Sequence, residues 1–250
     1  MKYPVRLSAI RESISLRRIT MVMLSRLVLI LIMPFALSGT ILCWAGDKMP
    51  GWYNAAREFV ETSIRLTAPN ANALELLKAQ EANVEKLRGI PSPPVKELNQ
   101  LIQSPRMEER ETALATAMVL RRTDSSLVKT IMVNYEQEQG FWAKFYSQQV
   151  LANITPSQLK EMEEQLFKIL QREPDEPIII AGLQTVERLE RGKRIELFVQ
   201  YMTRGSEGLQ RVCAVHLRKV GKPDIDVVTS ALRKRNATRA LGYLEQFRGE

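Results

Sequence analysis

The stretch that decides the fold is 209–235, with the sequence LQRVCAVHLRKVGKPDIDVVTSALRKR. Apolar residues recur every three or four positions on both sides of Gly221-Lys222-Pro223-Asp224, which is the spacing of an amphipathic helix. Glycine and proline within a short polar segment end one helix and begin the next. The stretch therefore predicts two helices, 209–220 and 225–235, joined by a tight turn.

Three similar pairs of helical segments precede this one: 107–122 with 127–135, 141–153 with 157–171, and 177–190 with 195–203. The first helices of the four pairs close on Leu120, Leu151, Leu189 and Val220, which are 31, 38 and 31 residues apart. Repeats of paired helices at such a period are typical of α-solenoids, in which a pair buries its apolar face only against its neighbours. We therefore expect an all-α fold, an α-solenoid of stacked helix pairs.

The chain resembles the HEAT-repeat family at 217–224, LRKVGKPD, and at 210–214, where QRVCA opens that helix. The turns at 119–124 and 150–157 carry the resemblance more weakly, and it covers 107–236 in all. Similarity to this family implies a curved helical scaffold that binds proteins, and it implies no activity. The alternative is an irregular helical bundle with accidental spacing.

Two regions flank the predicted HEAT-like repeats of 107–236. Residues 46–106 form an N-terminal helical region that contains a stiff, proline-rich linker at 89–94, GIPSPP. Residues 237–250 are expected to be a C-terminal tail.

The first 45 residues have the pattern of a secretory signal. Residues 27–45, LVLILIMPFALSGTILCWA, carry no charge, and the segment before them holds six basic residues and only one acidic residue. A basic lead, an apolar stretch and small residues at its end predict export, with cleavage after Ala45. The alternatives are an uncleaved signal anchor, a lipoprotein at Cys43, a start at Met21 or Met23, and a buried core helix.

Much of the net positive charge lies in the predicted signal, so the charge after its removal is the relevant one. The whole chain carries a net +8, whereas 30 basic and 27 acidic residues remain after 1–45 are removed. The remainder is polarised, because 46–187 has a net charge of −4 and 188–250 a net charge of +7. The basic end could meet an anionic partner or membrane surface. A solvated basic helical end is the simpler interpretation.

Few residues are candidates for catalysis. His216 is the only histidine, and Cys213 is the only cysteine that remains after cleavage. An active site would bring Cys213, His216 and Arg211 together, but a packing role is favoured for Cys213 and His216, since a reactive thiol needs exposure and cationic neighbours. We therefore predict no catalytic, metal or cofactor-binding residues, and no cofactor.

Two acidic clusters and one aromatic cluster have structural explanations. The acidic residues lie near predicted helix starts, where negative charge is stabilised, and are expected to be solvated: Glu108, Glu109, Glu111, Glu161, Glu163 and Glu164. Trp142, Phe145 and Tyr146 share one helical face, and such a stripe is usually core. No phosphate-binding loop, zinc spacing or nucleophile elbow is present in the sequence.

These observations predict an exported, non-catalytic scaffold of the bacterial cell envelope that binds proteins through its solenoid surface, within a secretion, pilus or envelope complex. We expect it to be periplasmic or secreted, or anchored in the inner membrane through 27–45 if the signal is uncleaved. One rival is an enzyme or enzyme subunit with a site near Cys213 and His216. Another is a nucleic-acid-binding repeat that uses the basic C-terminal region, although export argues against a nucleic-acid partner.

Overall fold

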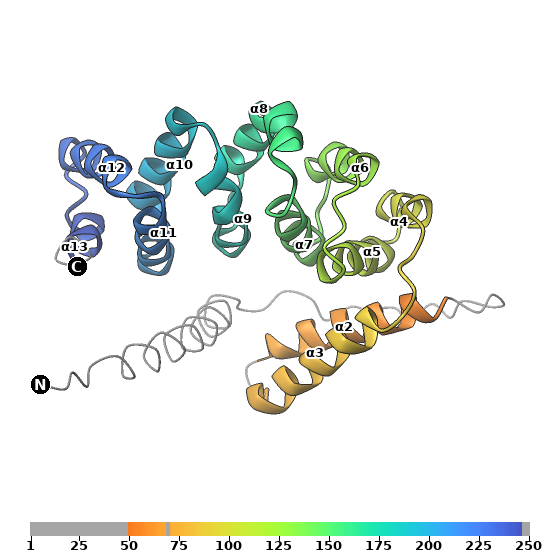
Figure 1. The fold of residues 1–250 in the computed structure, drawn as a ribbon. Coiled ribbons are helices and arrows are strands. Elements are labelled where there is room, and N and C mark those ends of the chain that lie inside the picture. The colour runs from red at the N-terminus through yellow and green to blue at the C-terminus, as the bar shows by residue number, and fades with distance from the viewer. Residues whose placement is uncertain (1–49, 69–70, 247–250) are drawn as a thin grey trace, which may run out of the picture. The chain divides into compact units, whose positions relative to one another are not determined.

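The computed structural model describes residues 50–68 and 71–246, and these form helices joined by short turns (Figure 1). The first helices are α2 (Gly51–Leu66), α3 (Ala73–Arg88), α4 (Val95–Ile102), α5 (Met107–Val119), α6 (Ser125–Tyr135) and α7 (Phe141–Leu151). The others are α8 (Pro156–Arg172), α9 (Glu176–Arg188), α10 (Arg191–Arg204), α11 (Glu207–Val220), α12 (Lys222–Lys234) and α13 (Thr238–Gln246). No strand occurs in this part of the chain, so the all-α prediction is confirmed.

The described residues belong to two compact units. One unit contains 61–68 and 71–80, the end of α2 and the start of α3, where Gln80 Nε2 donates a hydrogen bond to Ser63 Oγ at 2.8 Å. The other contains 50–60 and 81–246, and therefore all of α4 to α13.

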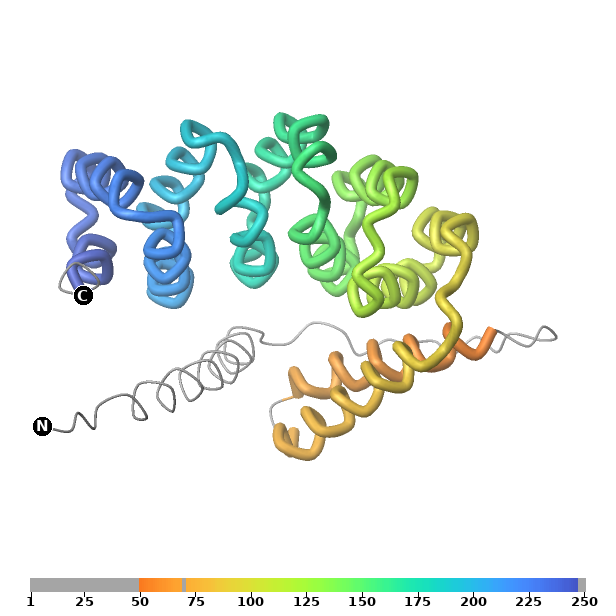
Figure 2. The backbone as a smooth tube through the Cα atoms, viewed as in Figure 1, coloured from red at the N-terminus to blue at the C-terminus, as the bar shows by residue number. Residues whose placement is uncertain are grey.

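Helices α4 to α13 form two layers (Figures 1 and 2). One layer is α5, α7, α9, α11 and α13, and the other is α4, α6, α8, α10 and α12. Within each layer every helix packs against the next, and consecutive helices along the chain alternate between the layers. Large side chains fill the interior: Leu127, Ile131, Leu151, Leu166, Leu170 and Phe198 are almost completely buried. Each such side chain contributes about 1.5–3 kcal/mol on burial, so the helical stripes seen in the sequence are what holds the layers together.

The ends of the helices follow the turn signals in most places. Thr155 Oγ1 accepts a hydrogen bond from the Gln158 amide at 3.3 Å, and Gln158 Oε1 accepts one from the Thr155 amide at 2.8 Å, which is a complete capping box at the start of α8. Gly221 separates α11 from α12 with a φ of 114°, a conformation that glycine adopts without strain. Asp124 does not cap α6 with its side chain, because its carboxylate accepts from Arg122 Nε at 2.8 Å.

The two layers extend beyond the repeat region expected at 107–236. Helix α4 packs against α5 and α6, and α13 packs against α11 and α12. The segment expected as a C-terminal tail therefore contains a helix, which buries Ala240 and Leu244. This nine-residue helix offers too few apolar positions to stand out by periodicity alone.

The proline-rich segment 89–94 connects α3 to α4 outside any helix and is fixed to the layers. Arg122 Nη1 donates to Ser92 Oγ at 2.5 Å and to the Pro93 carbonyl at 3.1 Å. The predicted signal segment at 1–45 lies outside the described residues. Among the described helices, none combines the length and the apolar character needed to span a membrane.

Candidate functional site

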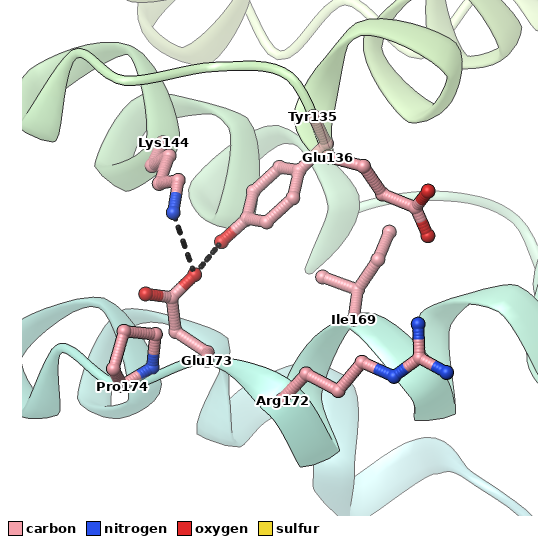
Figure 3. A pocket seen from close by; sticks show the side chains of 7 residues that line it. All are labelled: Tyr135, Glu136, Lys144, Ile169, Arg172, Glu173 and Pro174. Atoms are coloured by element: carbon pink, nitrogen blue, oxygen red, sulfur yellow. Dashed lines mark hydrogen bonds and ion pairs between the residues drawn. The ribbon is translucent and has the colours of Figure 1, made fainter.

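An open pocket of about 320 Å³ lies where the end of α6, the first turns of α7 and the turn between α8 and α9 meet (Figure 3). Polar and charged side chains dominate its lining: Tyr135, Glu136, Lys144, Ile169, Arg172, Glu173 and Pro174. Converging polar groups in a concave pocket are typical of ligand-binding sites.

Glu173 is the centre of this pocket. Its side chain is only 2% exposed, and its Oε2 atom accepts a hydrogen bond from the Tyr135 hydroxyl at 2.9 Å. Lys144 Nζ lies 3.5 Å from the same oxygen, and the Asp175 amide donates to Oε1 at 3.3 Å. One buried carboxylate thus joins α6, α7 and the α8–α9 turn.

Tyr135 extends the network into the core. Gln148 Nε2 donates to the Tyr135 hydroxyl oxygen at 2.9 Å. Burial raises the pKa of Tyr135 far above its usual range, so the phenol stays protonated and donates to Glu173. Gln148 Oε1 is buried and has no hydrogen-bond partner within the described part of the chain.

The open side of the pocket carries two opposite charges. Figure 3 shows Glu136 and Arg172 on the side away from the Glu173–Lys144 pair, with Ile169 between them. Both oxygens of Glu173 accept hydrogen bonds from the protein, so this carboxylate holds α6 against the α8–α9 turn. An acid and a base side by side select neither an anion nor a cation, so the pocket indicates no ligand class.

Replacement of Gly182 by alanine is expected to destabilise the protein, because the new methyl group would press on Gln148, which belongs to the Tyr135–Glu173 network. A Cβ atom there would lie 2.6 Å from Leu170 Cδ2 and 2.9 Å from Gln148 Oε1. Overpacking of this kind costs about 1–3 kcal/mol, which urea unfolding would measure. Gly242→Ala is the matched control, because nothing lies within 4 Å of its Cβ position in α13. Equal effects of the two substitutions would contradict the prediction, since alanine in an open helical position is stabilising.

The three candidate catalytic residues of α11 are not brought together around one space. Cys213 is fully buried, and burial raises the pKa of its thiol. His216 Nδ1 lies 2.5 Å from Glu187 Oε1 of α9. Arg211 is exposed, pairs with Glu207 at 2.5 Å, and lies over the ring of Tyr243 with 5.1 Å to the centroid. The three side chains therefore have separate surroundings: a buried thiol, a histidine paired with Glu187 of α9, and an exposed arginine over Tyr243 of α13.

The acidic clusters are mostly engaged in surface ion pairs. Glu108 pairs with Arg57 at 3.0 Å, Glu161 with Lys129 at 3.0 Å, and Glu164 with Lys193 at 3.2 Å. No group of three His, Cys, Asp or Glu residues suited to a metal ion occurs among the residues that the structure describes.

The expectation of a solvated side chain is wrong for Glu111, which is 6% exposed. Burial, with a smaller contribution from the nearby Glu138, raises its pKa to about 7. The folded state therefore prefers the neutral acid, and stability falls as the pH rises from about 4.5 to about 7.

Replacement of Glu111 by glutamine is expected to remove this pH dependence. At pH 8 the substitution should stabilise the protein by an amount of the order of 2 kcal/mol, because no buried charge remains. Urea unfolding at pH 5 and pH 8 measures the effect, with the exposed Glu108→Gln as control. A glutamine variant that loses stability equally at both values would show that the carboxyl group accepts essential hydrogen bonds.

The aromatic residues of α7 behave as core, as predicted. Tyr146 is 1% exposed, and Trp142 and Phe145 pack against the core, with the rings of Trp142 and Tyr146 stacked at 5.6 Å. Phe59 of α2 joins them, 6.1 Å from Tyr146 between ring centroids. This contact and the Glu173 network were not predicted, because they join residues that no sequence spacing connects.

Comparisons with known proteins identify no relative. No family model matches the chain, and no curated protein and no solved structure is significantly similar to it.

Proposed function

We propose that this chain is an exported, non-catalytic scaffold whose stacked, HEAT-like helix pairs form an α-solenoid that binds other proteins. The observation that supports the proposal is the packing of α4 to α13, in which each helix contacts the next one in its own layer. Such stacking produces extended surfaces on which partners bind by shape and charge.

The chemistry of the candidate residues supports a binding role over an enzymatic one. A nucleophilic thiol needs exposure and a lowered pKa, whereas Cys213 is fully buried and burial raises its pKa. His216 is occupied by Glu187. In the Glu173 pocket the carboxylate is already satisfied by its neighbours.

The C-terminal end is the proposed location for an anionic partner. Arg233 and Lys234 end α12, Arg235 follows as its C-cap, and all three are exposed. Within the described residues none of them takes part in an ion pair, so their charge is available to a partner. Export to the periplasm, or anchoring through 27–45, remains part of the proposal on the basis of the sequence pattern.

The test is a pull-down of the tagged full chain from detergent-solubilised membranes, read by mass spectrometry. We expect specific partner proteins to be recovered, and fractionation to place the chain outside the cytosol. The variant R233E/K234E/R235E should lose only partners held by the basic end. Cys213→Ala combined with His216→Ala should retain all partners if it folds. Recovery of no specific partner, or a cytosolic location, would overturn the proposal.

A further inference from the structure

The first half of α2 is packed as a bound helix would be. Trp52, Ala55, Ala56 and Phe59 are all buried, and their spacing is that of the anchors i, i+3, i+4 and i+7 of an amphipathic helix on a protein surface. Residues 50–60 belong to the same compact unit as α4 to α13. This half-helix therefore packs with the layers.

The surface that receives this helix spans two successive helices of one layer. Arg57 Nε lies 3.0 Å from Glu108 Oε1 of α5, and the Tyr53 hydroxyl adjoins the Thr112 side chain of the same helix. The ring of Phe59 lies against that of Tyr146 of α7. We call Glu108, Thr112 and Tyr146 the α2 seat. A helix that only capped the end of the stack would contact the terminal helix alone, whereas α2 crosses from α5 to α7.

Helix α5 is buried along the turns that follow Glu108. Every residue of 111–117 is buried, including Glu111, Thr112 and Thr116. A helix in an outer layer normally keeps one polar, exposed face. Among residues 111–117, Thr112 adjoins Tyr53, so α2 covers this part of α5, while α4 and α7 pack on the same helix.

We propose that the α2 seat is a binding site for an amphipathic helix with aromatic anchors and a basic residue opposite Glu108, and that α2 occupies it within the same chain. A partner helix of this chemistry competes with α2 for the seat. The inference rests on the proposed scaffold function and names the class of partner and its regulation. Tethering gives α2 a millimolar effective concentration, so the seat is closed until α2 is displaced.

The test uses the full chain in mild detergent and a fluorescein-labelled peptide of residues 50–66, followed by fluorescence anisotropy. The unmodified chain should bind this peptide weakly, because its own α2 fills the seat. The variant W52A/F59A, which weakens α2 in the chain and leaves the seat intact, should bind the peptide at least tenfold more tightly.

A charge exchange separates specific binding from adhesion to exposed apolar surface. Adding E108R to the W52A/F59A variant should weaken binding of the natural peptide and strengthen binding of an R57E peptide. The proposal would be overturned if the folded W52A/F59A chain did not bind the peptide. It would also be overturned if the natural and R57E peptides bound equally well to W52A/F59A with and without E108R.

If W52A/F59A does not fold, E108R alone tests the seat, because Glu108 is exposed and its replacement removes no core atoms. Hydrogen exchange of 51–60 should become faster in this variant, and faster still when the R57E peptide is added, because the peptide then occupies the seat in place of α2. Unchanged hydrogen exchange of 51–60 would overturn the inference. A stable dimer in which the α2 of each copy packs on the other copy would also overturn it. If the peptide does not bind but the pull-down still recovers specific partners, the α2 seat is ruled out and the scaffold proposal is retained.

Discussion

Replacement of Asp224 by alanine is expected to lower the free energy of unfolding by about 3–5 kcal/mol, as removal of one partner from a buried ion pair does. Asp224 is 4% exposed and accepts from Arg191 Nε and Arg194 Nε, each at 2.8 Å. Arg194 also donates to the carbonyl oxygens of Glu187 and Leu189. The carboxylate thus holds the start of α12 against the α9–α10 turn, and its loss leaves a largely buried guanidinium without its counter-charge.

The two arginines provide a graded control. The Arg191 side chain is 56% exposed, so Arg191→Ala should cost less than about 1 kcal/mol. Arg194 is 17% exposed, and Arg194→Ala should approach the effect of Asp224→Ala. Urea unfolding followed by circular dichroism measures all three. If Asp224→Ala costs no more than Arg191→Ala, the buried pair does not hold the two turns together.

Acid should reduce the contribution of Asp224. Burial acts to raise the pKa of this carboxyl, but the hydrogen bonds from Arg191 and Arg194 outweigh it and lower the pKa. Because the pKa of Asp224 is lower in the folded state, its ionised carboxylate stabilises the fold at pH values above the unfolded-state pKa of about 3.9. This stabilisation is lost as the pH falls through the folded-state pKa. The difference between the natural chain and Asp224→Ala should therefore shrink below about pH 4, opposite in direction to the pH effect of Glu111.

Local signals in the sequence predicted most helices, because spacing and turn chemistry act over a few residues. The glycine at 221 ends α11 as expected, although α12 already begins at Lys222, inside the predicted turn. Asp124 has the right chemistry for a cap, but a neighbouring arginine takes its carboxylate. Helix α13 was not predicted, because only Ala240 and Leu244 are fully buried on its inner face.

The candidate site depended on contacts that sequence spacing does not encode. Glu173 lies in the acidic turn between α8 and α9, and Tyr135 and Lys144 from two other helices contact its buried carboxylate. Glu111 resembled an exposed residue near a helix start, and burial reverses that interpretation. Both cases require knowing which helix packs on which, and helical periodicity does not supply this.

Replacement of Glu173 by alanine is expected to cost about 3 kcal/mol, since the Tyr135 hydroxyl and Lys144 would both lose their buried acceptor. Glu173→Gln should cost less, because the amide oxygen still accepts from Tyr135 while the charge opposite Lys144 is lost. Glu136→Ala at the open rim of the same pocket is the control and should change stability by less than about 0.5 kcal/mol.

A double-mutant cycle with Tyr135→Phe distinguishes a connected network from independent contacts. If Tyr135 and Glu173 act through their 2.9 Å hydrogen bond, the two substitutions should be non-additive by about 0.5–3 kcal/mol. The pair with Glu136→Ala should be additive, because no hydrogen bond joins Glu136 to Tyr135 within the described residues. Additive losses for Tyr135→Phe and Glu173→Ala would mean that the buried carboxylate is held by Lys144 and the backbone alone, and that α6 is positioned by apolar packing.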